Sequence, residues 1–520
     1  MTALSARRGS PPAALAAAVL LITVITSLPL IYLLLRVVET GPRQLGSEVA
    51  RARIGTLLAN TGILAVSVTL AAMIIGLAAA WCVERSDLPG RRAWRILLCL
   101  PLAVPAFVAS YAWSSLSGAF GGMGGAILIL TLCKYPLVML PAAAALRGSG
   151  GHLEDISRTL GHGAWGTFAR ITLPLLRPAL GGGALLVLSH MLAEFGALSL
   201  LRVQTFTTAI FDAYQLQFDN ATAASLSGIL VALCLPAAFG EMFARARLKL
   251  TPAGQGGGRR RPPVRLGLMA PVITVLLILL TLLALGVPLF TLIYWLMRGS
   301  SAGLGLEDLW PAIRGSLSLS LPGAVIVTLI AFPIVRLTSV HRSASAMLAD
   351  RIPYIVHSLP ALVVALSLVF MSLRFVPELY QTRTLLFAAY ATLFLPLAQS
   401  ALRASSEQLS PNLEAAARTL GWGPIAAFLR IGLPNLAPGL AAAFSLSALE
   451  LMRELSATLI LAPTGVTPLA TEVWSRANDA QYAAAAPYAA ILVAVSAIPV
   501  YVFARRSLTA TERVRLTDLE

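Results

Sequence analysis

The chain has 520 residues, of which 57% are hydrophobic and 12% are charged, and its mean hydropathy is +0.80. This composition excludes an ordinary water-soluble protein, because too few charged residues remain to cover a soluble surface, and it indicates a protein of the lipid bilayer. The net charge of +16 does not indicate nucleic-acid binding, since the basic residues lack interleaved aromatic residues and are separated by long apolar runs.

Six apolar segments, each near the roughly 20 residues that cross hydrocarbon, precede residue 250. The first is too long for the core of a cleaved signal peptide and is followed by Arg36. The six cover about residues 12–35, 61–83, 96–116, 126–146, 179–201 and 221–244.

Six more apolar segments follow a Gly/Arg/Pro-rich stretch, which we interpret as a cytoplasmic linker at 251–265. They cover about residues 268–297, 316–337, 352–373, 384–402, 437–461 and 482–503. The sequence therefore predicts an all-α polytopic membrane protein of about 12 transmembrane helices.

The distribution of Lys and Arg predicts the orientation of these helices. If both termini are cytoplasmic, 27 of the 39 Lys and Arg residues fall in cytoplasmic segments, counting Arg336 at the cytoplasmic end of its span, 10 fall in outer segments, and Lys134 and Arg453 lie within spans. The positive-inside rule favours this topology.

A long internal repeat organises the chain. Residues 153–180 and 413–440 align without a gap at a constant offset of 260, which is half the chain length, and both contain Arg-Thr-Leu-Gly and a later Leu-Pro. With six spans in each copy, the two repeats have the same orientation and are expected to be related by an axis along the membrane normal. We place the first repeat at 1–250, the second at 266–505 and a cytoplasmic tail at 506–520.

Within each repeated stretch the residues predict a short helix, a sharp stop and a second short helix. In the second copy Ser410 is a candidate cap, Pro411 suits the first helical position, and Gly421 suits the left-handed residue that ends a helix. A helix this short is marginal alone, so its apolar stripe must pack on something. That stripe consists of Leu413, Ala416, Ala417 and Leu420, and the first copy repeats it with Leu153, Ile156 and Leu160.

The spacing of these residues resembles the EAA loop of binding-protein-dependent ABC importer permeases. The matching positions are Glu154, Gly161, Ile171, Leu173 and Pro174, and then Glu414, Gly421, Ile431, Leu433 and Pro434. The second copy reads Glu-Ala-Ala from Glu414, whereas the first departs from the pattern with Glu154-Asp155-Ile156. With the number of spans and the placement of the loops, the resemblance covers essentially the whole chain and implies a type I importer permease fold with EAA loops at 148–178 and 405–438.

The resemblance implies that each loop docks in a groove of a separate cytoplasmic ABC ATPase, two copies in all. It also implies that a periplasmic solute-binding protein delivers the solute at the bacterial inner membrane. The coupling residues implied are Glu154, Arg158, Leu160, Gly161, Glu414, Ala415, Ala416, Arg418, Leu420 and Gly421.

ATP binding is expected only on the partner subunits. A phosphate-binding loop needs Gly-Lys followed by Ser or Thr, and neither Lys134 after Cys133 nor Lys249 after Leu248 fits. Paired-cysteine metal spacing is also absent, since the four cysteines lie singly in apolar runs. We therefore expect a transport subunit without cofactor or metal rather than an enzyme, and no nucleic-acid partner.

Ionisable residues inside the predicted spans are candidates for function, because such residues are costly in hydrocarbon. His190 corresponds to Glu450 and Glu194 to Glu454 at the offset of 260, and in each copy the two positions share one helix face. Two readings stay open. These residues line the interface between the halves near the solute path, or they form interhelical ion pairs or hydrogen bonds that involve Arg453.

Pro105-Ala106 and Pro360-Ala361 match at an offset of 255 and predict a kink at the same place in both copies. A gating role and plain packing are both compatible with such a kink.

The solute class comes from resemblance alone. Residues 193–196, 203–210 and 451–458 resemble the double-length permeases of ferric-iron importers, which are similar in turn to permeases for thiamine, aminoethylphosphonate and polyamines. Fe(III) is therefore the leading expectation. A proton-coupled secondary transporter also has six plus six spans but would not need two matching cytoplasmic loops, and a membrane-embedded enzyme would need a catalytic constellation that the sequence does not offer.

Overall fold

The computed structural model describes residues 13–49, 52–148, 152–250, 263–299, 306–340, 344–407 and 412–517. Within these ranges the chain is helical, and its one β pairing is an isolated parallel bridge between Ser86 and Val264. Ten of the described helices are long and apolar enough to cross a membrane, or up to twelve if each of two bent helix pairs is one span. The predicted all-α polytopic membrane fold is thus confirmed.

The chain divides into two compact units, each with a core of three long helices. The first unit comprises Gly46–Leu304 and Val473–Glu520. Its core helices are α2 (Ala52–Arg85), α6 (Pro136–Gly148) and α9 (Leu173–Ala193), all in mutual contact. Gly76 of α2 and Gly183 of α9 each face Val138 of α6 so closely that an added Cβ would lie 2.9 Å from its atoms, so only glycine allows this helix spacing.

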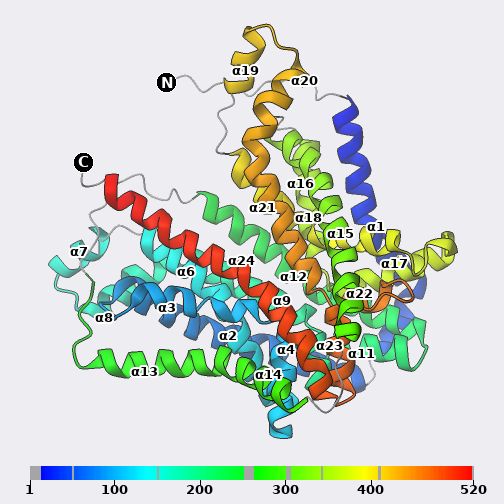
Figure 1. The fold of residues 1–520 in the computed structure, drawn as a ribbon, viewed down its shortest axis with the longest axis horizontal. Helices are drawn as coiled ribbons and strands as arrows, with labels where there is room; N and C mark the ends of the chain where they lie inside the picture. The colour runs from blue at the N-terminus through cyan, green and yellow to red at the C-terminus, as the bar shows by residue number, and fades with distance from the viewer. Residues whose placement is uncertain are drawn as a thin grey trace. The chain divides into compact units, whose positions relative to one another are not determined.

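The second unit comprises Met1–Leu45 and Gly305–Glu472 and repeats this core. Helices α15 (Leu306–Val340), α18 (Arg383–Ser406) and α21 (Leu433–Met452) run side by side in Figure 1 and contact one another. The first helix of the chain, α1 (Ala13–Val49), adds Val19 to the buried cluster between them.

The compact units do not follow the boundaries of the sequence repeats. Helix α1 precedes the core of the first repeat in the chain but packs in the second unit. Conversely, α13 (Met269–Thr281), α14 (Val287–Arg298) and α24 (Tyr482–Thr517) belong to the second repeat and lie in the first unit. There the Trp295 indole donates to Ser115 Oγ at 3.0 Å and the Tyr111 hydroxyl donates to the carbonyl of Tyr482 at 2.7 Å.

Both predicted kinks are present as sharp bends between two helices. In the first unit α3 (Arg91–Leu97) and the 3₁₀ turn η1 (Leu100–Ala103) meet α4 (Ala106–Leu116) at 87°. In the second unit α16 (Ala344–His357) meets α17 (Ala361–Phe375) at 103°. Pro105 and Pro360 occupy the N-cap of the second helix in each pair, which confirms the kinks predicted from these residues.

Two predicted spans are interrupted. The segments predicted at 179–201 and 437–461 consist of α9 followed by α10 (Gly196–Leu200), and of α21 followed by α22 (Ser456–Leu461). The breaks come after Ala193 and Met452, where the backbone leaves helical geometry and a glutamate side chain caps the next short helix.

The remaining helices connect these elements. In the first unit they are the 3₁₀ turn η2 (Gly118–Phe120), α5 (Gly122–Lys134), α11 (Phe206–Phe211), the π-helical turn η4 (Asp212–Leu216), α12 (Asn220–Leu250) and the π-helical turn η5 (Leu282–Gly286). The 3₁₀ turn η7 (Pro377–Leu379) lies in the second unit, and α23 (Leu469–Asn478) spans the boundary at residue 472. The backbone of α24 continues as a helix to Thr517, so most of the predicted tail at 506–520 is helical. Of the predicted linker, residues 251–262 lie outside the described part of the chain.

Candidate coupling loops

The first repeated loop folds as two short helices and a π-helical turn. Helix α7 (His152–Thr159) ends at Gly161, whose φ of 87° only glycine adopts readily, and α8 (Ala164–Thr167) follows. The amide of His162 donates to the carbonyl of Ser157 at 3.1 Å, which is the 6→1 bond of a Schellman stop. The π-helical turn η3 (Phe168–Thr172) then leads into α9.

The second loop has the same elements at an offset of 260. Helix α19 (Asn412–Thr419) ends at Gly421, with a φ of 89°, and α20 (Pro424–Ala427) follows. The amide of Trp422 donates to the carbonyl of Ala417 at 3.2 Å, and the π-helical turn η8 (Phe428–Gly432) leads into α21. In Figure 1 α19 and α20 lie beyond the end of α21. The predicted caps Ser410 and Pro411 lie outside the described residues.

Each loop exposes large apolar side chains at equivalent positions. Leu160 and Leu420 are 73% and 79% exposed, and Trp165 and Ile425 are 80% and 75% exposed. The predicted stripe is divided, because Ala417 is buried whereas Leu413, Ala416 and Leu420 are exposed. Exposed leucine, tryptophan and isoleucine on a short, firmly stopped helix pair are suited to a protein groove. We call these four side chains the knob residues.

The predicted coupling residues do not share one environment. Arg158 is exposed, but Glu154 is buried at the base of the first loop. Its carboxylate accepts hydrogen bonds from Thr172 Oγ1 at 2.8 Å and from the guanidinium of Arg85 at 3.3 Å. Glu154 therefore fastens α7 to α2 and to η3. The backbone of α19 is described, but the side chains of Glu414, Ala415 and Arg418 lie outside the described residues.

Each loop contains a contact between an arginine and a ring-bearing side chain that the sequence analysis did not predict. In the first loop the guanidinium of Arg170 lies 3.2 Å from the imidazole of His162, and in the second Arg430 stacks over the Trp422 ring at 5.0 Å. The signal was available, because the arginine recurs at the offset of 260 and follows a ring-bearing residue by eight positions in both copies.

Glu194 and Glu454 act as helix caps in the structure. The carboxylate of Glu454 accepts from the amides of Ala457 and Thr458 at 3.0 and 2.9 Å and from the Thr458 hydroxyl at 2.8 Å. The carboxylate of Glu194 accepts from the amide of Ala197 at 3.2 Å. Both carboxylates thus satisfy backbone donors at the start of α22 and α10.

The other intramembrane candidates make local contacts. Arg453 Nε donates to Glu450 at 3.1 Å, which is an ion pair within one helix end rather than between helices. The exposed His190 is hydrogen-bonded through Nδ1 to the carbonyl of Leu186 at 2.8 Å. Both contacts are local to one helix, whereas the sequence analysis considered contacts between helices.

No cluster of three or more His, Cys, Asp or Glu side chains that could hold a metal ion occurs among the described residues. All four cysteines are free thiols, and three of them are buried.

A helical membrane bundle built twice, with a short helix pair exposing apolar side chains in each copy, defines a polytopic membrane protein with paired exposed loops. Residues 72–245 and 337–513 match the family of binding-protein-dependent transport system inner membrane components. The chain belongs to this family, whose members are the membrane permeases of ABC importers.

Three relatives illustrate the range of similarity. The Fe(3+)-transport system permease protein FbpB 2 of Haemophilus influenzae is 40% identical over 495 residues, which cover 94% of this chain and 98% of that protein. The molybdenum transport system permease protein ModB of Escherichia coli is 30% identical over 183 residues, which cover 31% of this chain and 80% of that protein. The sulfate transport system permease protein CysT of Escherichia coli is 26% identical over 258 residues, which cover 45% of this chain and 93% of that protein.

Proposed function

We propose that this permease couples solute import to ATP hydrolysis on two separate ABC ATPase subunits, one docked on each of the two loops. The observation that supports this most strongly is the duplicated knob: Leu160 and Leu420, and Trp165 and Ile425, project from helix pairs with the same stop. Two alike apolar knobs on one chain suit two copies of one partner.

The proposed solute is ferric iron, delivered by a periplasmic binding protein. This rests on the similarity over nearly the full length of both chains to a permease described as an Fe(3+)-transport protein. A permease of the same class for thiamine, aminoethylphosphonate or a polyamine is the alternative. ATP and its chemistry belong to the partner subunits in this proposal, and the permease supplies the membrane pathway.

The proposed topology places both termini and both loops in the cytoplasm of a bacterial cell, as the distribution of Lys and Arg favours. Arg147 and Arg403, in the last turns of α6 and α18, lie directly before the loops and agree with cytoplasmic ends there.

The test is purification of the detergent-solubilised chain with its ATPase. We expect the wild-type chain to retain about two ATPase subunits, and Leu160→Asp with Leu420→Asp to retain few, since a charge replaces an exposed apolar side chain at the equivalent position of each loop. Leu216→Asp is the matched control, because Leu216 is 69% exposed in η4 on the opposite predicted side. Retention of both subunits by the double variant would contradict the proposal.

Transport by purified components separates the other candidates. Uptake of radioactive Fe(III) into proteoliposomes should require the ATPase, ATP and the binding protein. Uptake driven by a pH gradient in the chain alone would instead identify a proton-coupled secondary transporter. The solute bound by the binding protein encoded beside this permease decides between iron and the alternatives.

A further inference from the structure

In the first unit, the ends of α2, α3 and α6 nearest the first loop are joined by an ionic cluster. Glu84 of α2 has a side chain only 3% exposed and accepts from Arg95 of α3 at 2.8 Å and from Arg147 of α6 at 2.7 Å. One buried carboxylate therefore connects three helices through charge-assisted hydrogen bonds.

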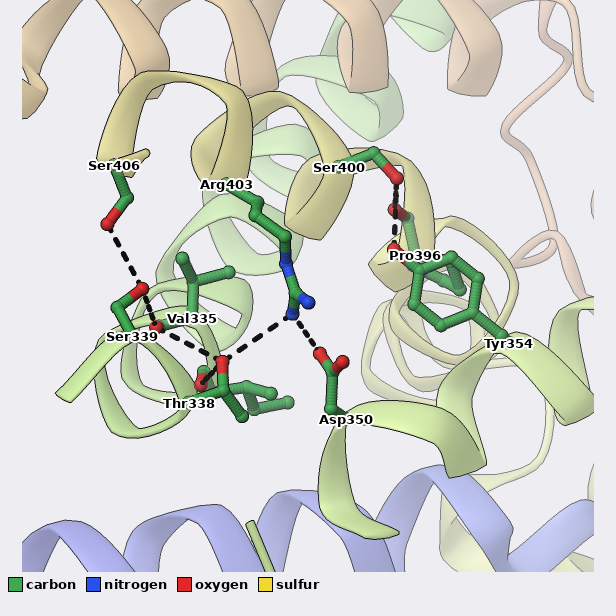
Figure 2. Close-up of polar contacts among 10 residues, drawn as sticks. Val335, Thr338, Ser339, Asp350, Tyr354, Pro396, Ser400, Arg403 and Ser406 are labelled. Atoms are coloured by element: carbon green, nitrogen blue, oxygen red, sulfur yellow. Dashed lines mark hydrogen bonds and ion pairs between the residues drawn. The ribbon is translucent and has the colours of Figure 1, made fainter. Parts of the chain in front are cut away.

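The second unit has a cluster at the equivalent helix ends, shown in Figure 2. Arg403 of α18 is paired with Asp350 of α16 and donates to the hydroxyl of Thr338 on α15 at 3.5 Å. Ser339 and Ser406 add a hydroxyl contact between α15 and α18 at 3.0 Å.

The two clusters occupy equivalent helix ends, but the charge is reversed at one pair of equivalent positions. Arg95 and Asp350 are related by the offset of 255 that also relates Pro105 to Pro360, and Arg147 and Arg403 end equivalent helices. In the first cluster an acid on α2 binds two arginines, whereas in the second an arginine on α18 binds an acid on α16. An ionic connection at this place thus exists in both halves although the residues differ.

The position of each cluster links a loop to a bend. Arg147 and Arg403 lie in the last turns of the helices that precede the loops, and Arg95 and Asp350 lie on the helices that lead into the bends of 87° and 103°. We propose that the two clusters are positioning elements that transmit movement of the docked loops to the bent helices α3–α4 and α16–α17.

This proposal rests on the proposed function, because it needs an ATPase docked on the loops. Its test measures solute transported per ATP hydrolysed in proteoliposomes that contain the permease, the ATPase and the binding protein. We expect Arg403→Ala and Asp350→Ala each to keep ATP hydrolysis within about twofold but to lower this ratio about tenfold, since the remaining partly buried charge loses its partner.

The exchanged double variant, Arg403→Asp with Asp350→Arg, should recover at least about half of the lost ratio, because it restores the ion pair with opposite polarity. Tyr354→Phe is the matched control, since the Tyr354 hydroxyl contacts Ser400 between the same two helices at 3.0 Å without charge. We expect this variant to keep the wild-type ratio.

A second measurement covers the case in which Arg403→Ala does not assemble. Glu84→Gln is nearly isosteric and tests the other cluster by the same ratio. The proposal would be overturned if the assembled variants transported as much solute per ATP as the wild type, or if an assembled exchanged pair recovered none of the lost ratio. It would also be overturned if both Arg403→Ala and Glu84→Gln failed to assemble. Failure of the proposed function looks different, because the wild-type chain would then retain no ATPase and show no ATP-dependent uptake.

Discussion

The glutamates at 194 and 454 show how one residue pattern allows two readings. Their recurrence at the offset of 260 predicted equivalent positions correctly, since each follows a core helix directly. Their cost in hydrocarbon suggested a role in the solute path, but the structure uses both to satisfy backbone amides where a helix breaks. The sequence could not predict this role, because the two breaks are visible only in three dimensions.

Glu454→Gln should destabilise the fold more than Glu194→Gln. The carboxylate of Glu454 accepts from two amides and a hydroxyl, and in glutamine one of the accepting atoms becomes an NH₂ donor that faces a donor. We expect a loss of roughly 1–3 kcal/mol for this variant and less for Glu194→Gln, which accepts from one amide. Thermal unfolding midpoints in detergent measure the difference. Wild-type midpoints combined with lost uptake in both variants would favour the pathway reading instead.

Gly421→Ala should weaken the second loop through its backbone alone. The position has a φ of 89°, and nothing lies within 4 Å of an added Cβ, so the cost of about 1–2 kcal/mol is conformational. Gly423→Ala is the control, because that site is equally open but lacks the left-handed φ. We expect retention of the ATPase to fall several-fold in Gly421→Ala only. Equal retention by the two variants would show that the stop at Gly421 is not needed for docking.

At the scale of elements, the features that local chemistry determines could be predicted. Pro105 and Pro360 marked the bends, and Gly161 and Gly421 marked the helix stops. The burial of Glu154 could not be predicted, because it depends on Arg85, which is 69 positions earlier in the chain, and on Thr172 at the end of η3. No residue pattern in the sequence marked the π-helical turns η3 and η8. The exposed ends of the loops were thus easier to predict than the contacts that hold their base.

The end of the linker is fastened to the turn after α2. The amide of Val264 donates to the carbonyl of Arg85 at 2.8 Å, the amide of Asp87 donates to the carbonyl of Val264 at 3.0 Å, and the Asp87 carboxylate accepts from the amide of Leu266 at 2.9 Å. Arg85, whose guanidinium donates to Glu154, therefore also binds the linker through its backbone carbonyl.

Asp87→Ala should loosen this attachment. Loss of the side-chain bond is worth about 1 kcal/mol, so we expect trypsin to cleave after the exposed Arg265 about fivefold faster. Asp87→Asn keeps an accepting oxygen and should cleave at nearly the wild-type rate. Mass spectrometry of timed digests measures the cleavage, and identical rates in the three proteins would contradict the attachment.

At the scale of the whole molecule, the sequence repeats and the compact units differ because terminal helices are exchanged. Helix α1 packs in the unit that holds α15, α18 and α21, and α14 and α24 pack with α4 in the other unit. The repeat was predictable from the constant offset, whereas the exchange was not, since an apolar helix in a bilayer carries little sequence information about its neighbours. Contacts such as that between Trp295 and Ser115 provide this information only in the folded chain.

The exchange of terminal helices between the compact units predicts that the two fragments of a chain cut within the linker remain associated. Fragments 1–256 and 257–520, co-expressed with different tags, should co-purify, because each fragment supplies a helix that completes the compact unit formed mainly by the other. Trp295→Ala in the second fragment should lower co-purification several-fold, since it removes the hydrogen bond that the Trp295 indole donates to Ser115 of the first fragment. Trp310→Ala is the control, because Trp310 is largely exposed. If the two fragments purified separately as stable, homogeneous proteins, the helices would pack within their own repeats and the exchanged arrangement would be wrong.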